Sequence, residues 1–260
     1  CLISGMSYAD GSSPQPVKPY WQDIQVVAVN KEKPRSSFMS YADRETALTS
    51  RFEKSPYYSL LNGTWKFFFV DSYKDLPQNI TDPSVNTSSW DDITVPGNWE
   101  VQGHGVAIYT NHGYEFKPRN PQPPLLPEAN PVGVYRRDIE IPANWDNRDI
   151  YLHIGGAKSG LYVYLNGKEV GYSEDSKNPD EFLINKYLQP GKNVLTLKIF
   201  RWSTGSYFEC QDFWRMSGIE RDVYLYSQPK VAIKDFRVTS TLDDTYKNGI
   251  FKLTMDIRNT

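Results

Sequence analysis

The stretch LYVYLNGKEVGYS, residues 161–173, decides the fold class of this 260-residue chain. Apolar and polar residues alternate on both sides of Asn166-Gly167, as they do in strands that bury one face. Asn and Gly both tolerate positive φ, which a two-residue type I′ turn requires. The stretch therefore predicts an antiparallel β-hairpin.

Further strand patterns occur at regular spacing on both sides of this hairpin. They are NGTWKFFFV (62–70), WDDITVPGNWE (90–100), VGVYRRDIEIP (132–142), RDIYLHIGG (148–156), KNVLTLKIFRWS (192–203) and RDVYLYSQP (221–229). Leu195, Leu197 and Ile199 share one face of their strand, and Thr196 and Lys198 share the other. No helical pattern separates the strands, which excludes βαβ units. The chain is therefore predicted to be all-β, an antiparallel jelly roll or β-sandwich.

Shifts in composition divide the chain into segments. Residues 10–50 are polar and proline-rich, contain one short helical candidate around YADRETALTSRF, and are interpreted as an arm that packs onto the domain. Residues 51–228 are expected to form the jelly roll. After Gln228-Pro229, residues 229–260 are interpreted as two strands of a second sandwich that is incomplete here, because a lone hairpin is marginal in water.

The first residues, CLISGMSYADGSSPQP, predict export. Residues 1–9 resemble the remnant of a signal peptide that ends in the small-residue pattern Ser7-Tyr8-Ala9. A lipoprotein that begins at Cys1 and an arbitrary start of the sequence are the alternatives. Export would place the protein in the periplasm or at the cell surface.

Composition excludes several classes of function. The formal net charge is −2 and 23% of the residues are charged, so neither a nucleic-acid groove nor a polybasic membrane surface is expected. No apolar stretch is long enough to span a membrane. The two cysteines and three histidines lack the spacing of a disulfide framework or a zinc site. Cys210 is expected to be a buried or partly exposed thiol, and His153 a core or strand-edge residue.

Two segments carry more polar and aromatic side chains than a sandwich needs. Residues 95–133 form a long irregular stretch that is too rich in aromatic residues for disorder, and we interpret it as a binding loop that follows the surface. The stretch FECQDFWRMSGIERDVYLY, residues 208–226, places two acids, an amide, a thiol and aromatic rings at the start of a strand. Such a cluster indicates a site, and aromatic rings can also stack on sugars.

Five motifs in order resemble the N-terminal sugar-binding domain of the large β-galactosidases of glycoside hydrolase family 2. They are LNGTWKF, VPGNWEVQGHGVAIYTN, NPVGVYRRD, YLNGKEVGYSEDS and RWSTGSYFECQDFWRMSGIERDVYLY. The resemblance runs from about Leu60 to the end of the chain. It implies a jelly roll, then an immunoglobulin-like domain that begins in residues 229–260, and then a catalytic TIM barrel. The two glutamates of retaining hydrolysis would lie on that barrel, so no catalytic residue is expected in this chain.

The resemblance assigns two substrate-binding residues. Asn111 matches the Asn of the IYTN motif, and Asp212 matches the acid of the QDxWRMSG motif. Both would reach into the active site on the barrel and bind hydroxyls of the galactosyl unit. Asp212 would also ligate a sodium ion, with further ligands outside this chain. A carboxylate suits hydroxyl donors and a hard cation, and an amide can both donate and accept.

One position departs from the family pattern. Thr204 stands where the best-known members carry an Asp after RWS, and that Asp helps to hold a peripheral magnesium ion. Threonine is a poorer magnesium ligand, so the peripheral site is not expected here. The magnesium ion of the full enzyme's active site would be bound outside this chain.

Structural roles compete with these functional ones. Without its motif, Asp212 would be interpreted as a turn residue, and Trp99 is expected in the core. Trp214 and Arg215 are expected to pack the domain, with Arg215 paired to Asp222 or to an acid outside the chain. Hydrogen bonds within the loop are expected of the two remaining polar residues, Glu209 and Gln211.

Three functions stay open. The first is the N-terminal, non-catalytic part of an exported β-galactosidase, which acts on β-galactosides together with the TIM barrel of the same full-length chain. The second is a free-standing carbohydrate-binding jelly roll, and the third is part of a family 2 β-glucuronidase or β-mannosidase. IYTN together with QDFWRMSG favours the first. Enzymes of this kind are often oligomers, so a homo-oligomer is compatible with the resemblance.

Overall fold

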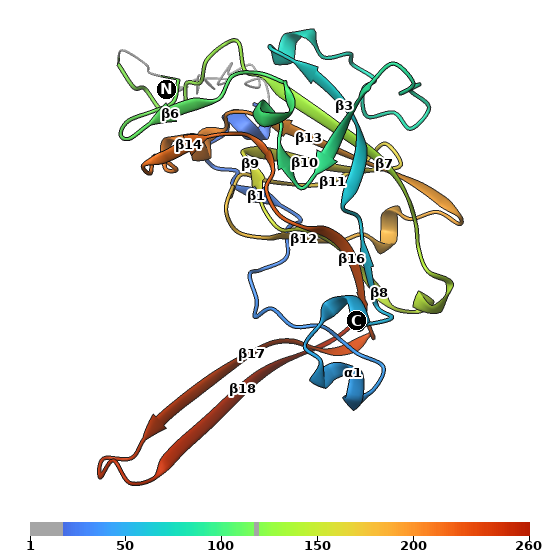
Figure 1. The fold of residues 1–260 in the computed structure, drawn as a ribbon, viewed down its shortest axis with the longest axis vertical. Coiled ribbons are helices and arrows are strands. Elements are labelled where there is room, and N and C mark those ends of the chain that lie inside the picture. The colour runs from blue at the N-terminus through green and yellow to red at the C-terminus, as the bar shows by residue number, and fades with distance from the viewer. Residues whose placement is uncertain (1–17, 117–119) are drawn as a thin grey trace, which may run out of the picture.

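The computed structural model describes residues 18–116 and 120–260, and its secondary structure is almost entirely β (Figure 1). The larger sheet runs in the order β1 (Ala28–Val29), β11 (Lys168–Ser173), β10 (Gly160–Leu165), β13 (Lys192–Phe200), β7 (Val132–Glu140), β3 (Gly63–Val70), β4 (Asp91–Val95). The smaller sheet runs β12 (Asp180–Leu183), β8 (Asp149–Ile154), β16 (Val223–Gln228), β2 (Tyr58–Leu60). Neighbouring strands in both sheets are antiparallel, which confirms the predicted β-sandwich.

The predicted hairpin is present as β10 and β11. Asn166 and Gly167 adopt φ values of 53° and 77°, the positive values that a type I′ turn requires. The pairing shifts between Val163 and Tyr164, where the ladder contains an irregularity. This bulge was not expected from the alternation of the sequence, which continues through it.

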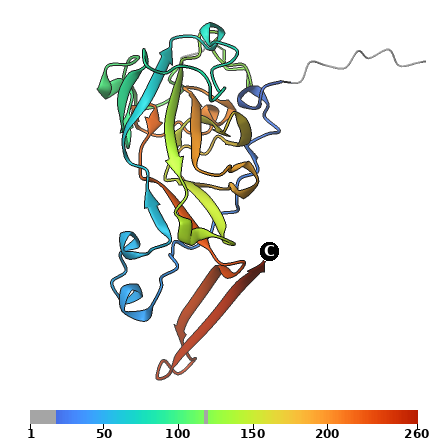
Figure 2. The same cartoon turned by 90° about the vertical axis from the view of Figure 1, so that its right-hand side faces the viewer.

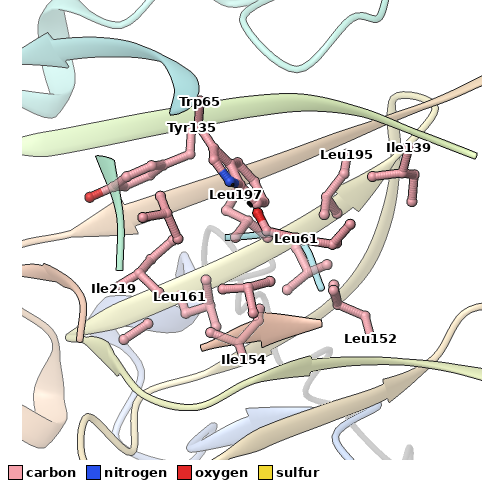
Figure 3. Close-up of a cluster of buried hydrophobic side chains, with 14 of the residues drawn as sticks. Leu61, Trp65, Tyr135, Ile139, Leu152, Ile154, Leu161, Leu195, Leu197 and Ile219 are labelled. Carbon is pink, nitrogen blue, oxygen red and sulfur yellow. Dashed lines mark hydrogen bonds between the residues drawn. The ribbon is translucent and has the colours of Figure 1, made fainter. Parts of the chain in front are cut away.

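The main core lies between the two sheets (Figure 3). Leu161, Leu195 and Leu197 of the larger sheet pack with Leu152 and Ile154 of the smaller sheet, and all five are at most 1% exposed. The expected face of β13 therefore points inward, because burying apolar area is the main favourable contribution to folding.

Residues 18–57 cover the outer faces of both sheets. Trp21, in the 3₁₀ turn η1 (Tyr20–Gln22), stacks on Phe200 of β13 with ring centroids 4.9 Å apart. Met39 packs with Tyr151 and Tyr226 on the smaller sheet, next to the short helix α1 (Arg44–Leu48). The outer faces are thus aromatic and covered, not solvated. The predicted signal-peptide remnant, residues 1–9, lies outside the described residues.

The remaining short elements connect the strands. The 3₁₀ turns are η2 (Phe52–Lys54), η3 (Tyr73–Asp75), η4 (Glu100–Gln102), η5 (Ala143–Trp145), η6 (Asn185–Tyr187) and η7 (Thr204–Tyr207). Two small sheets are separate from the two main sheets in strand pairing. They are β5 (Gly97–Asn98) with β15 (Gly218–Ile219) and β9 (Ala157–Lys158), and β6 (Ile108–Thr110) with β14 (Phe213–Arg215). No helix of the described residues is long and apolar enough to cross a membrane.

A long hairpin of β17 (Val231–Leu242) and β18 (Gly249–Asn259) extends away from the sandwich, as Figure 2 shows. The Asp149 carboxylate joins it to β8, because Arg258 Nη2 and Thr260 Oγ1 lie 3.0 and 2.8 Å from Asp149 Oδ2. Apolar side chains along the hairpin are exposed, for example Val231 at 60% and Phe251 at 66%. That residues 229–260 begin an immunoglobulin-like sandwich stays a prediction.

Replacing Gly133 by alanine should destabilise the sandwich by about 1–3 kcal/mol. A Cβ at this position of β7 would lie 2.7 Å from Phe67 Cε2 and press on the Trp99 ring, and both neighbours are fully buried. Chemical denaturation measures the loss. Gly249→Ala in β18 is the matched control, since its Cβ meets no atom within 4 Å. Equal stability of the two variants would contradict the close packing at Gly133.

A buried carboxylate on the smaller sheet should make stability depend on pH. Glu181 Oε2 accepts hydrogen bonds from Arg35 Nε at 2.8 Å and Tyr226 Oη at 3.0 Å, and His153 Nδ1 lies 2.9 Å from Oε1. Burial alone would raise the pKa of Glu181, but the hydrogen bonds from His153 and Arg35 lower it to about 2. Because the folded pKa lies below the unfolded one, this contribution is present above about pH 4.5 and is lost as pH falls toward about 2.

Glu181→Gln should therefore remove about 2–3 kcal/mol of acid-dependent stability. Urea unfolding of wild type and variant at pH 7, 4.5 and 3 measures how steeply the free energy of unfolding of each protein falls with pH. Glu140→Gln, at the exposed end of β7, is the control and should keep the wild-type slope. Parallel curves for wild type and Glu181→Gln would show that the carboxylate does not carry this dependence.

Candidate functional site

The two predicted site residues lie next to each other at one end of the β6–β14 ribbon. Thr110 of β6 pairs with Phe213 of β14 in antiparallel register, and Asn111 and Asp212 directly adjoin this last pair, one on each strand. The two strands are far apart in sequence, and in Figure 1 they lie side by side at the end of the molecule opposite the β17–β18 hairpin. The fold thus brings the IYTN and QDxWRMSG motifs together.

The ribbon has a solvent face and a buried face, because opposed residues share a face and successive residues alternate. Tyr109 and Trp214 are opposed and share the solvent face, Asp212 meets the Tyr109 hydroxyl there, and these three residues and Asn111 are all exposed. The Tyr109 and Trp214 rings touch, with centroids 5.7 Å apart, and are 53% and 54% exposed. A carboxylate and an amide therefore stand beside an open aromatic pair.

Tyr109 orients the Asp212 carboxylate. Its hydroxyl donates a hydrogen bond to Asp212 Oδ1 at 2.8 Å, and this bond raises the pKa of the phenol. Asn111 Oδ1 lies 2.7 Å from His112 Nδ1. A cleft of about 560 Å³ opens along this segment, lined by residues 109–114 and Pro121.

The segment before the ribbon is anchored in the core. Trp99 is fully buried, as expected, and its ring packs on Phe67 and Phe69. The neighbouring Glu100 carboxylate accepts the backbone N–H of Ser217 with both oxygens, at 3.0 and 2.8 Å, and burial raises the pKa of Glu100. This part of residues 95–133 is thus anchored in the core, and its interpretation as a binding loop stays a prediction.

The loop that leads into β14 is held by its own polar side chains. The Glu209 carboxylate accepts hydrogen bonds from the backbone N–H and hydroxyl of Ser176, at 2.9 and 2.5 Å, so it bonds to the connection between β11 and β12 and not within its own loop. Burial raises the pKa of the partly buried Cys210 thiol.

The buried Thr204 hydroxyl donates to Glu174 Oε1 at 2.7 Å.

Two expectations need correction. Arg215 does not pair with Asp222: its Nη1 donates to the Glu209 carbonyl at 2.6 Å, while Asp222 accepts from Asn62 Nδ2 at 2.8 Å. Trp214 does not pack into the domain, because β14 turns its ring outward beside Tyr109. Tyr109 was not named as a site residue from the sequence, and the structure shows it exposed and bonded to Asp212. Its position two residues before Asn111, in the same IYTN motif, was the signal that could have identified it.

The Asp212 carboxylate at the ribbon can supply only part of a binding site for a hard cation. Within residues 18–116 and 120–260, no three His, Cys, Asp or Glu side chains gather closely enough to hold a metal ion. Asp212 Oδ2 has no hydrogen-bond partner among these residues, so one carboxylate oxygen remains available. A sodium ion bound there would need further oxygen ligands from elsewhere.

Together these features define an antiparallel β-sandwich that presents polar and aromatic groups suited to sugar recognition on a protruding ribbon. The family model described as "Glycosyl hydrolases family 2, sugar binding domain" matches residues 58–229. The chain belongs to glycosyl hydrolase family 2 and carries the sugar-binding domain of that family.

Two curated relatives are similar over most of this chain. The chain is 41% identical over 244 residues to the beta-galactosidase of Priestia megaterium, covering 93% of this chain and 24% of that protein. It is 37% identical over 229 residues to the beta-galactosidase of Psychromonas ingrahamii, covering 88% of this chain and 22% of that protein. The chain thus spans about a quarter of the length of these relatives.

Solved structures agree on the fold. The beta-glucuronidase of an uncultured Clostridium species matches with a TM-score of 0.57 at 22% identity, over 77% of this chain and 33% of that chain. The Bifidobacterium dentium beta-glucuronidase matches with a TM-score of 0.58 at 17% identity, over 78% of this chain and 36% of that chain. At these identities the likeness concerns the fold alone.

Proposed function

We propose that this chain is the N-terminal, non-catalytic part of a retaining β-galactosidase. In this role it lends Asn111 and Asp212 to a galactose pocket that a TIM barrel outside the chain completes. The observation that supports the proposal is the pairing of β6 with β14, which ends at Thr110 and Phe213, so that Asn111 and Asp212 adjoin the last pair, and both are exposed. The names of the curated relatives support galactosidase activity.

Each residue has a defined part in sugar recognition. Asp212 keeps Oδ2 available for a sugar hydroxyl while Tyr109 fixes Oδ1, and a carboxylate accepts stronger hydrogen bonds than a neutral group. The Asn111 amide can donate and accept, so it can discriminate the orientation of a hydroxyl. Neither side chain carries out the chemistry, which requires two carboxyl groups on opposite sides of the glycosidic bond.

Two metal ions belong to the proposal. Asp212 would supply one ligand to a sodium ion that also contacts the bound sugar, with its other ligands from outside the chain. The magnesium ion of the active site would be bound outside the chain as well. Thr204 argues against a peripheral magnesium site at its position, because its buried hydroxyl is already engaged by Glu174.

A β-glucuronidase is the second candidate within the family. The solved structures with that name share the sandwich fold, but at 17–22% identity they do not bear on the sugar. A free-standing carbohydrate-binding module is the third candidate, and the exposed Tyr109–Trp214 pair is the observation that favours it.

An assay of the product of the complete reading frame separates these candidates. The product is tested on aryl β-galactoside, β-glucuronide, β-mannoside and β-glucoside, beside the 260-residue chain. We expect the full product to cleave the galactoside preferentially and the 260-residue chain to cleave none of them. Preferential cleavage of the glucuronide or mannoside would reassign the sugar, and sugar binding without cleavage by either protein would favour the binding module.

A further inference from the structure

We propose that Arg201 is a positioning residue that clamps both strands of the β6–β14 ribbon to the core strand β13. It would thereby set the place of Asn111 and Asp212 relative to the bound sugar. This inference rests on the function proposed above for those two residues.

The Arg201 side chain binds the base of the ribbon on both strands. Arg201 directly follows β13, and its backbone N–H donates to the Pro131 carbonyl at 2.9 Å. Its Nη2 donates to the Val106 carbonyl at 2.9 Å, two residues before β6 begins, and to the Arg215 carbonyl at 3.2 Å, where β14 ends. One guanidinium nitrogen therefore bridges the two strands of the ribbon.

The same guanidinium is paired with two acids of the segment that surrounds β6. Arg201 Nη1 lies 3.6 Å from Glu100 Oε1, and Arg201 Nε lies 3.8 Å from Glu115 Oε2. Glu115 is paired in turn with Lys158 Nζ of β9 at 2.8 Å. Arg201 is only 3% exposed, so these charges act where water screens them little. The planar fork of an arginine suits this set of partners, and a lysine ammonium does not reproduce it.

The ribbon depends on such support because it has little of its own. Each strand has three residues, and an isolated two-stranded ribbon is marginal in water. Its outward face is exposed, so only the inward contacts can fix its position. Sugar-binding groups need placement to within a fraction of an ångström, which a loosely held ribbon does not provide.

The test compares Arg201→Lys with a matched variant, Arg136→Lys, in the product of the complete reading frame. Arg136 on β7 is 5% exposed, and its guanidinium donates to the carbonyls of Ile80 at 2.7 Å, Asp82 at 2.9 Å and Val85 at 3.1 Å. It therefore holds another loop by the same kind of contact, away from the ribbon. Both substitutions keep the positive charge and remove the planar guanidinium with its several N–H donors.

Hydrogen exchange tests the clamp directly. In Arg201→Lys, amides of residues 106–111 and 212–217 should exchange about tenfold faster, while amides of β10 and β13 keep their wild-type rates. In Arg136→Lys the ribbon amides should exchange as in wild type. Unchanged exchange in the ribbon of Arg201→Lys, or the same increase in both variants, would overturn the proposal.

Kinetics test the positioning role. Arg201→Lys should lower kcat/KM for an aryl β-galactoside roughly tenfold, whereas Arg136→Lys should leave it unchanged. Faster ribbon exchange with unchanged kcat/KM would overturn the role in positioning. Failure of the proposed function has a separate signature, because Asp212→Ala would then retain activity whatever the exchange experiment shows.

Discussion

Replacing Asp212 by alanine in the product of the complete reading frame is expected to lower kcat/KM for an aryl β-galactoside roughly a hundredfold to a thousandfold. The proposed carboxylate would accept a sugar hydroxyl and bind a sodium ion, and alanine offers neither interaction. The fold should survive, because Asp212 is exposed and its one hydrogen-bonded partner among the described residues is Tyr109. Steady-state kinetics with a thermal unfolding scan of the same sample measure both effects.

Two neighbouring substitutions sharpen this prediction. Gln211→Ala changes the adjacent exposed position and should leave kcat/KM within about twofold of wild type. Tyr109→Phe removes the hydrogen bond that orients Asp212 but keeps the ring, so a loss of about tenfold is expected. Replacing sodium by potassium should lower the activity of wild type and not that of Asp212→Ala. Near-wild-type turnover of Asp212→Ala would disprove the proposed contact.

Much of the sandwich could be predicted because its strands are long and periodic. The alternation in 192–203 identified both faces of β13, and Asn166-Gly167 identified the turn between β10 and β11. Each of these signals is local, so it can be recognised without the rest of the fold. The covered outer faces could not be recognised in this way, because Trp21 and Met39 come from a segment without strand alternation.

The site was harder to predict than the fold. Asn111 and Asp212 were identified by resemblance, and no local pattern indicated that β6 and β14 pair across about a hundred residues. Strands of three residues are too short for periodicity to reveal. The buried charges beneath the ribbon, such as Arg201 and Glu115, gave no signal, because charged residues are expected at the surface unless a fold pairs them.

The buried pair of Lys158 and Glu115 gives the largest expected effect on stability. Lys158 Nζ lies 2.8 Å from Glu115 Oε1, and the two side chains are 1% and 4% exposed. Glu115→Ala should destabilise the fold by about 3–5 kcal/mol, because the Lys158 ammonium would remain buried without its counter-charge. Arg201 keeps its second acid, Glu100, at 3.6 Å, so the penalty should arise mainly at Lys158. Chemical denaturation at pH 7 measures the loss.

A double variant distinguishes a lost counter-charge from a lost side-chain volume. Lys158→Met combined with Glu115→Leu removes both charges and fills the space, so it should recover most of the stability that Glu115→Ala loses. The single variants Lys158→Met and Glu115→Leu, together with this double variant and wild type, form a cycle whose coupling energy isolates the pair. If the double variant were less stable than Glu115→Ala, packing at the base of the ribbon, and not charge pairing, would set the stability of this region. Recovery would instead assign the penalty to the unpaired ammonium, and the fold would then tolerate an apolar pair beneath the ribbon.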